Sequence, residues 1–315
     1  MARVSKILDD FSGSEYYVDY NAGNDSSGDG SVSYPWKTIK HAVESGITRN
    51  STNGDRINLK SGYAHVVTST PNVSTYGTPT VAAPLFFQGY TSAANDGGYA
   101  EITCSGTVSL VDTNKPYLRF AYLSVTSGGY AINNHSYTIL IECKVESTGT
   151  GYRPYYGASN HHQAYYCTFV SNFTSSPWWK AFQISGGGEL VNCLFLINGH
   201  SGAALKSNTV NCLAIVNNGT TDHGPVFTES DWYLNTSVVI NGSKNTTGRH
   251  AFSGGYARMI GCYVQGADTA YGIERTRMFV GNGYYDCTTA STTTSYSDPF
   301  SYYDGVAIYE AAAQA

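Results

Sequence analysis

The stretch "CLFLINGHSG" (residues 193–202) decides the fold, because the chain repeats it. It opens with a cysteine, alternates apolar residues and ends near an Asn-Gly pair. "CLAIVNNGTT" follows from Cys212, and "TSVVINGSKN" follows from Thr236. A sequence that returns to one short pattern at near-constant intervals is typical of a solenoid, a propeller or an array.

The pattern extends over much of the chain. Cys143 lies in "IECKVEST", Cys167 in "YYCTFVSN", Cys262 in "IGCYVQGA" and Cys287 in "YDCTTAST", while Tyr122 in "AYLSVTS" fits one step earlier. The intervals between these positions are 21, 24, 26, 19, 24, 26 and 25 residues. The period is therefore about 24 residues, with loops of variable length.

The repeating unit selects one architecture. Each unit has a short alternating strand followed by a turn, and none has the 3.6-residue apolar period of a helix. A propeller blade needs about 40 residues, so the units are too short for blades. The sequence therefore predicts an all-β, single-stranded parallel β-helix in which each coil is one rung and equivalent residues stack about 4.8 Å apart.

Two columns of stacked side chains follow from this alignment. The first is a column of small residues inside the narrow core, where free cysteine packs well. The second lies five residues further on, where asparagine suits a sharp corner and its amides can bond along the column. Seven cysteines is an odd number, which favours reduced thiols over disulfides. The two predicted columns are Cys143, Cys167, Cys193, Cys212, Thr236, Cys262 and Cys287, and Asn172, Asn198, Asn217 and Asn241.

The bulk composition restricts the function. Charged residues make up 13% of the chain and the formal net charge is −5, so bulk attraction to nucleic acid or to an anionic membrane is not expected. No apolar run approaches the ~18 residues of a membrane-spanning helix. The opening "MARVSKILDDFSG" lacks the apolar stretch of a secretory signal.

The front of the chain differs from the repeats. Residues 16–46, "YYVDYNAGNDSSGDGSVSYPWKTIKHAVESG", predict a strand, a polar loop and a helix over about 35–46. Pro35 suits the first helical position, and Trp36, Ile39 and Val43 fall on one face. This helix is expected to cap the open end of the β-helix. The predicted organisation is an arm over 1–14, a β-helix domain over 15–290 and a C-terminal cap or contact segment over 291–315.

This front end resembles right-handed parallel β-helix proteins of the pectate-lyase-like superfamily. Their usual opening is a tyrosine-valine strand, a G-N-D-S-x-x-G loop and P-W/F-K-T-I before a small helix, and "GDRINLKSGYAHV" and "FFQGY" fit their first rungs. The resemblance covers about the first 105 residues specifically. The resemblance implies a right-handed coil. The superfamily includes polysaccharide lyases, glycoside hydrolases, phage tailspikes and other virion proteins, so the resemblance does not fix the function.

Catalytic candidates are few. Asp222 and His223 in "TTDHGPV" are the nearest match to a polar catalytic corner, with His200 one rung before and Arg249 and His250 one rung after. The simpler interpretation is that all five are solvated loop residues. No cofactor is expected. The loop with Asp19, Asn21, Asn24, Asp25 and Asp29 offers oxygen ligands for Ca²⁺, but Asx-turns explain it more simply.

Aromatic residues in two long turns are the remaining functional signal. Aromatic faces stack on sugars and also anchor protein interfaces. We expect a partner surface there, for a protein or a glycan. The binding candidates are Tyr152, Tyr155, Tyr156, Trp178 and Trp179.

These observations favour a bacteriophage virion protein, made in the host cytoplasm without a signal and released by lysis. A short arm of about 14 residues leaves no room for a separate head-binding domain, so a head decoration protein or a short spike is expected. Capsid or tail proteins are its expected partners, a homotrimer its expected state, and a cell-surface glycan a further ligand. The alternatives are a polysaccharide lyase or glycoside hydrolase of the tailspike type, and a glycan-binding adhesin without turnover.

Overall fold

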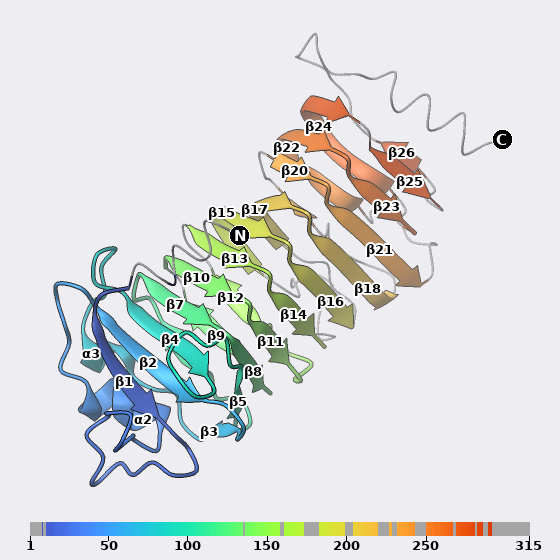
Figure 1. Ribbon diagram of the computed structural model, residues 1–315. Coiled ribbons are helices and arrows are strands. Elements are labelled where there is room, and N and C mark those ends of the chain that lie inside the picture. The colour runs from blue at the N-terminus through green and yellow to red at the C-terminus, as the bar shows by residue number, and fades with distance from the viewer. Residues whose placement is uncertain are drawn as a thin grey trace.

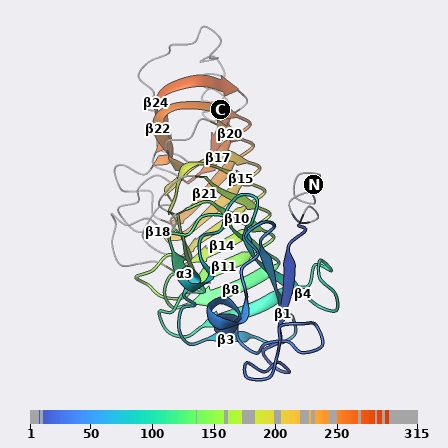
Figure 2. The same cartoon turned by 90° about the vertical axis from the view of Figure 1, so that its left-hand side faces the viewer.

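The computed structural model is a right-handed parallel β-helix with a small helical cap at its N-terminal end (Figure 1). Figure 2 shows the coils stacked on one another from the cap toward β24. The fold predicted from the repeats is confirmed. The structure describes residues 8, 11–134, 136–157, 161–172, 183–198, 204–219, 227–228, 232–242, 250–266, 269–280, 282–285 and 289–291.

Each coil contributes to three surfaces, which we call faces A, B and C in chain order around a complete rung. Face B is a ten-stranded sheet, and faces A and C are the two branches of a sixteen-stranded sheet that forks at the long strands β15, β17, β22 and β24. Neighbouring strands pair in parallel, as in β10 with β13 and β11 with β14. Every turn returns the chain to the same faces, so the strands stack in columns; face C begins only with the coil that contains Val111–Thr113.

The strands of face A are β1 (Ser14–Val18), β2 (Asp55–Lys60), β4 (Leu85–Tyr90), β7 (Leu118–Ala121), β10 (Thr138–Ile141), β13 (His162–Tyr165), β15 (Gln183–Val191), β17 (Ala204–Val210), β20 (Trp232–Leu234), β22 (His250–Ile260) and β24 (Thr269–Val280). The last halves of the long strands lie on this face and their first halves on face C. Face C also contains β6 (Val111–Thr113), β9 (Ile132–Asn134), β12 (Tyr155–Gly157), β19 (Phe227–Thr228) and β26 (Thr289–Ser291). Face B consists of β3 (His65–Val67), β5 (Ala100–Cys104), β8 (Leu123–Ser127), β11 (Lys144–Ser147), β14 (Thr168–Ser171), β16 (Leu194–Asn198), β18 (Leu213–Gly219), β21 (Ser237–Gly242), β23 (Tyr263–Gln265) and β25 (Gly283–Tyr285).

A single left-handed residue turns each coil from face A to face B. Its φ lies between 47° and 65° in seven successive rungs. Asparagine and glycine adopt this conformation at least cost, and asparagines at this corner form a column in which Asn235 donates to Asn211 Oδ1 at 3.2 Å. The corner residues are Tyr122, Glu142, Tyr166, Asn192, Asn211, Asn235 and Gly261.

Placing Tyr122 in the cysteine column was wrong. Tyr122 occupies the left-handed corner, and Leu123 takes the inward position that follows it, since Ser124 pairs with Lys144. Leu123 is fully buried, as the cysteines are. The prediction was shifted by one residue. Because side chains alternate along a strand, this shift exchanges an inward position for an outward one.

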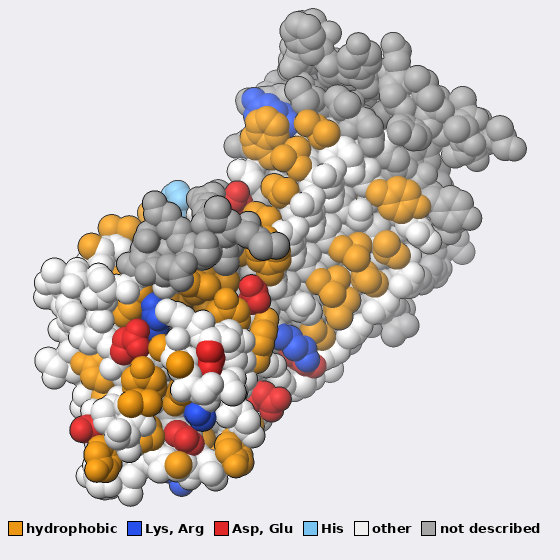
Figure 3. Space-filling view, viewed as in Figure 1, with side chains coloured by type: hydrophobic (Ala, Val, Ile, Leu, Met, Phe, Trp, Pro, Cys, Tyr) orange, Lys and Arg blue, Asp and Glu red, His pale blue; other side chains and the backbone are white. Residues whose placement is uncertain are grey.

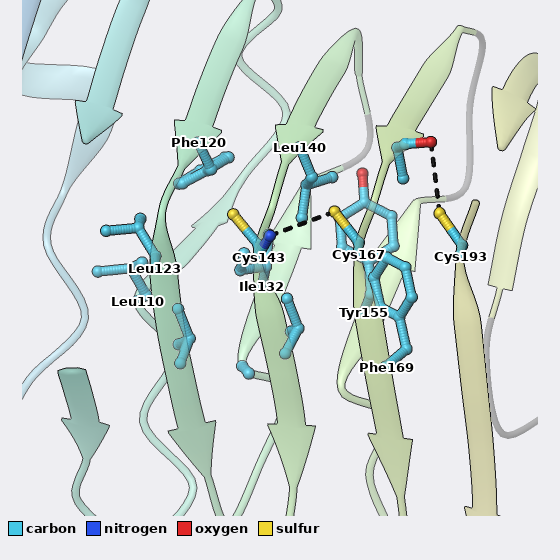
Figure 4. Packing of buried hydrophobic residues seen from close by; sticks show 14 of the residues in the cluster. Leu110, Phe120, Leu123, Ile132, Leu140, Cys143, Tyr155, Cys167, Phe169 and Cys193 are labelled. Atoms are coloured by element: carbon cyan, nitrogen blue, oxygen red, sulfur yellow. Dashed lines mark hydrogen bonds between the residues drawn. The ribbon is translucent and has the colours of Figure 1, made fainter. Parts of the chain in front are cut away.

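The cysteines stack as free thiols inside the solenoid. Cys143, Cys167 and Cys193 lie on consecutive rungs beside Phe169 and Tyr155 (Figure 4). The thiols donate to backbone carbonyls, as from Cys143 Sγ to Ile141 O at 3.3 Å. Thr236 fits the same column because its hydroxyl makes an equivalent bond to Leu234 O at 3.1 Å. Cys287 lies outside the described residues.

Asparagine side chains form a continuous ladder where face B ends. Asn198 donates to Asn172, Asn217 to Asn198, and Asn241 to Asn217, at distances of 3.0 to 3.2 Å. Asn172 itself donates to Ser147 O at 3.0 Å, which anchors the ladder to the backbone. Each inner amide therefore serves as donor to one rung and acceptor from the next.

We expect Asn217→Ala to lower the free energy of unfolding by about 1 to 2 kcal/mol, because it removes both ladder bonds of the central amide. Urea unfolding followed by circular dichroism measures the change. Asn53→Ala, in an exposed loop, is the control and is expected to stay within about 0.5 kcal/mol of the parent. Equal losses in the two variants would contradict a stabilising ladder.

The helical cap begins later than the sequence pattern predicts. Pro35 is not its first residue, because Trp36 pairs with Val18 as extended backbone and Thr38 is the N-cap. The helix α2 (Ile39–His41) continues into a π-helical turn (Ala42–Gly46), and a second short helix, α3 (Val73–Tyr76), packs against that turn. Trp36 and Val43 are buried with the first rungs, so the segment does close the core at this end.

The N-terminal arm folds back onto its own β-helix. Leu8 and Phe11 pack on outward-facing residues of face A, including Phe86. The Arg56 guanidinium lies 4.4 Å from the Phe11 ring centroid and donates to Leu8 O at 3.0 Å. Arg56 also donates to Asn95 Oδ1 at 2.8 Å. This buried cation of β2 therefore joins the arm to the loop that follows β4. Residues 1–7 of the predicted docking arm lie outside the described part.

Candidate functional site

Most catalytic and tryptophan candidates from the sequence fall outside the described residues. These are Asp222, His223, His200, Arg249, Trp178 and Trp179. His250 begins β22, where its backbone pairs with Thr269, but its side chain is not among those described. The tyrosine candidates are described, and the candidate site is built from their surroundings on face C.

Three tyrosines and an arginine form one cluster at the start of face C. The ring of Tyr130 lies 5.4 Å from Tyr152 in an edge-to-face arrangement and 5.8 Å from Tyr156. Arg153 lies 5.1 Å from the Tyr156 ring centroid. All three tyrosines are half-buried. We call Tyr130, Tyr152, Arg153 and Tyr156 the tyrosine cluster.

The register of face C explains why these residues meet. Tyr155 pairs with Ile132 and Tyr156 pairs with Asn133, so coils 24 residues or so apart in sequence lie side by side. Ile132 and Tyr155 point into the core, and the alternation of the strand turns Asn133 and Tyr156 outward. Tyr130 and Arg153 each precede these strands by two residues and stand beside one another.

Tyr155 is not part of the exposed surface, so that part of the sequence prediction was wrong. It is fully buried, and its hydroxyl lies 2.7 Å from His162 Nδ1. Burial raises the pKa of Tyr155 above its ordinary range, so the phenol stays protonated. Two adjacent tyrosines on a strand cannot both face solvent, and the registry with Ile132 selects Tyr156.

Arg153 places a cation at the base of the cluster. Its side chain is buried, and burial is the main cause that lowers its pKa, while Tyr130 and Tyr156 act in the opposite direction. A guanidinium remains charged at neutral pH, so a positive group lies over the Tyr156 ring. Tyr130 and Arg153 are not among the residues predicted from the sequence, although both stand at one rung position, before the strands β9 and β12.

Polar groups continue outward along face C. Asn133 Nδ2 donates to Asp112 Oδ1 at 3.0 Å on the neighbouring coil. The Oδ1 atom of Asn133 is buried and has no hydrogen-bond partner among the described residues. Asp112, Asn133 and Tyr156 therefore form an outward row across three coils, next to the tyrosine cluster.

A second aromatic column marks the other edge of face C. The Tyr137 ring stacks on Tyr117 at 4.9 Å and on His161 at 5.0 Å, with interplanar angles of 17° and 8°. These residues immediately precede β7, β10 and β13, and Tyr117 and His161 have positive φ. The outer surface of these three coils thus carries polar groups between two aromatic edges.

The acidic front loop is organised by backbone bonds. Asp19 Oδ1 accepts from the Asn21 and Ala22 amides, and Asp25 Oδ1 accepts from Lys37 N at 2.8 Å and Thr38 N at 3.0 Å. Within the described ranges, no group of three or more His, Cys, Asp or Glu side chains is arranged to hold a metal ion. No helix in that part of the chain is long and apolar enough to cross a membrane.

Comparison with known proteins adds little beyond the fold. No model of a protein family matches the sequence, and no curated protein matches it. Among solved structures, the pectin methylesterase from Aspergillus niger in its deglycosylated form is similar over 91% of this chain and 88% of that chain. The two share 13% sequence identity and superpose with a TM-score of 0.34. At these values the likeness does not support transfer of a function.

Proposed function

We propose that the protein binds a glycan on the outer surface of face C, between the tyrosine cluster and the Tyr117–Tyr137–His161 column. The observation that carries the proposal is the tyrosine cluster, in which the Tyr130 ring contacts Tyr152 and Tyr156 and the Arg153 guanidinium lies over the Tyr156 ring. Binding is the function proposed, without turnover of the glycan.

The chemistry of this surface suits a sugar chain. Aromatic rings offer apolar area to the C–H faces of a pyranose, and their hydroxyls bond to its polar rim. Asn133 and Asp112 supply amide and carboxylate groups beside the rings, and the amide oxygen of Asn133 is an acceptor that a sugar hydroxyl can satisfy after a small side-chain movement. The outward row of Asp112, Asn133 and Tyr156 spans three coils about 4.8 Å apart, so a short sugar chain can lie along the solenoid axis.

We place this binding protein on a virus particle, as a head decoration protein or short spike. Support comes from the resemblance of the first rungs to a superfamily that includes virion proteins, and from the rigidity of the stacked asparagine and cysteine columns. A rigid solenoid holds a binding surface at a fixed distance from its point of attachment. Immunogold labelling of virions with antibody against the purified protein tests whether the protein lies on the particle. Particles that remain unlabelled would contradict this location.

We expect Tyr156→Ala to weaken glycan binding by about 3- to 10-fold, which corresponds to the 0.5 to 1.5 kcal/mol of one aromatic contact. Purified protein is first screened against an array of bacterial surface polysaccharides and uronans. Isothermal titration calorimetry then gives the Kd of the strongest ligand for the parent and the variant.

Tyr63→Ala is the matched control, because Tyr63 is 56% exposed in a loop after β2 and far from face C along the chain. Its Kd is expected to equal that of the parent. No binding anywhere on the array, or equal losses in the two variants, would contradict the proposal. Appearance of new reducing ends or unsaturated uronates during the assay would favour the enzymatic alternative instead.

A further inference from the structure

The corner between faces A and B changes its residue type along the solenoid. The later coils turn there with asparagine or glycine, which adopt positive φ at least cost. The three coils before them turn at Tyr122, Glu142 and Tyr166, with φ of 54°, 48° and 57°. Strained conformations of ordinary residues concentrate at ligand-binding sites, so these three side chains mark a candidate site.

A fourth residue extends this stretch by one coil. Ala100 pairs with Leu123, so Tyr99 stands beside Tyr122 at the same corner of the preceding coil. The rings of Tyr99 and Tyr122 meet edge to face, with centroids 6.0 Å apart and an interplanar angle of 79°. Consecutive coils therefore present tyrosine, tyrosine, glutamate and tyrosine. We call Tyr99, Tyr122, Glu142 and Tyr166 the corner site.

The side chains of the corner site are accessible from solvent. Tyr99 is 46% exposed and Tyr166 is 36% exposed. Tyr122 and Glu142 are half-buried. In Figure 3 the molecular surface over these coils carries hydrophobic side chains with acidic groups between them. A ligand can therefore reach the aromatic rings and the carboxylate at the same time.

Glu142 places one negative charge among neutral rings. Within the part of the chain that the structure describes, its carboxylate forms no hydrogen bond and no ion pair. Lys144, two residues further along, is paired with Glu146 at 2.8 Å. Burial, and next the nearby charge of Glu142, raise the pKa of Tyr99 to about 12, so this phenol stays neutral. The carboxylate and the negative faces of the rings both favour a cation here.

The coil spacing brings the rings within range of a cation bound to Glu142. Ala121 pairs with Ile141, and Ile141 pairs with Tyr165, so Tyr122 and Tyr166 flank Glu142 on the two neighbouring coils. Equivalent positions on neighbouring coils lie about 4.8 Å apart. A ring face attracts a cation up to about 6 Å from its centroid. An ammonium group on carbon suits this arrangement, because its carbon atoms also contact the rings.

We propose that the corner site binds an organic ammonium group, held at Glu142 between Tyr122 and Tyr166. The group can be a trimethylammonium, as in choline, or the primary amine of an amino sugar, since both carry one positive charge bonded to carbon. The corner site shares no residue with the tyrosine cluster on face C. Its ligand is therefore independent of the glycan proposed there.

The test is a titration of the purified full chain with choline and, separately, with glucosamine, followed by proton NMR of the ligand. Choline is expected to bind with a Kd on the order of 1 mM, and its N-methyl signal to move upfield because the tyrosine rings shield it. The neutral analogue, with tert-butyl in place of trimethylammonium, is expected to bind at least about 10-fold more weakly. Tighter binding of glucosamine than of choline would assign the site to amino sugars, and the reverse order to choline-type head groups.

Two substitutions identify the site. Glu142→Gln keeps the shape of the side chain and removes its charge, so the Kd for the better ligand is expected to rise at least about 5-fold. Glu146→Gln, which removes a carboxylate of the same coil from face B, is the matched control and should leave the Kd unchanged. Tyr166→Asn installs the residue that later coils use at this corner, so the protein is expected to fold as the parent does while the Kd rises about 3-fold or more.

Urea unfolding of the variants establishes that the losses of binding are not losses of folding. The absence of binding by both ammonium ligands would overturn the proposal. Equal Kd values for choline and its neutral analogue, or an unchanged Kd in Glu142→Gln and Tyr166→Asn, would overturn it as well.

Discussion

Replacing Phe195 with alanine is expected to lower the free energy of unfolding by about 3 to 5 kcal/mol. Phe195 is fully buried, stacks on Phe169 with ring centroids 5.1 Å apart and an interplanar angle of 5°, and meets the edge of Phe227 at 6.2 Å. Its removal opens a cavity between stacked coils. The rungs on both sides are fixed by backbone ladders, so they cannot collapse into the space.

The measurement is urea unfolding of both proteins followed by circular dichroism. Tyr34→Ala removes a similar ring from a loop position that is 66% exposed, and its effect is expected to stay within about 0.5 kcal/mol. A loss below about 1 kcal/mol for Phe195→Ala would show that this interior position is not packed as described.

Raising the pH from 8 to 11 is expected to destabilise the protein strongly. Burial raises the pKa of Cys104 and of Cys262 to about 12, from an ordinary value of 9.0. The folded thiols stay protonated while the unfolded thiols ionise, so stability is fully present below about pH 9 and is lost as pH rises toward 12. At pH 11 each thiol contributes a loss of about 2 to 3 kcal/mol.

Urea unfolding under reducing conditions at pH 8, 9, 10 and 11 measures this loss. Cys262→Thr is the matched variant, because Thr236 already occupies an equivalent position in the same column. Its stability is expected to fall less steeply with pH, by about 1.4 kcal/mol per unit above pH 9. A parent protein equally stable at pH 8 and pH 11, or an unchanged slope in Cys262→Thr, would contradict protonated buried thiols.

The candidate site was less accessible to sequence reasoning than the fold. Tyr152 and Tyr156 were found because aromatic pairs stand out in a long turn. Tyr130 and Arg153 were missed because the strands β9 and β12 are only three residues long and carry no alternating pattern. The burial of Tyr155 depends on its pairing with Ile132. No local sequence feature of either segment predicts this pairing.

The corner column shows the same limit at a single position. The segments "VNC", "VNC" and "LNT" place an asparagine before three residues of the cysteine column. In other coils the same left-handed position is held by Tyr122, Glu142 and Tyr166. Neither tyrosine nor glutamate favours positive φ. The coil geometry imposes the conformation there, and only the paired strands on either side reveal it.

The sequence by itself determined the parallel β-helix and its inward cysteine column, because a repeat of about 24 residues makes every rung face the same environment as its neighbours. Stacked rungs must bury the same positions, so the periodicity of the sequence is sufficient to predict both the fold and the inward column. Only the tertiary structure decided where the helical cap begins, which tyrosine faces outward and which side chains stand together at the corner between faces A and B. These depend on the register between coils, where a shift of one residue exchanges the inside of the solenoid for its surface.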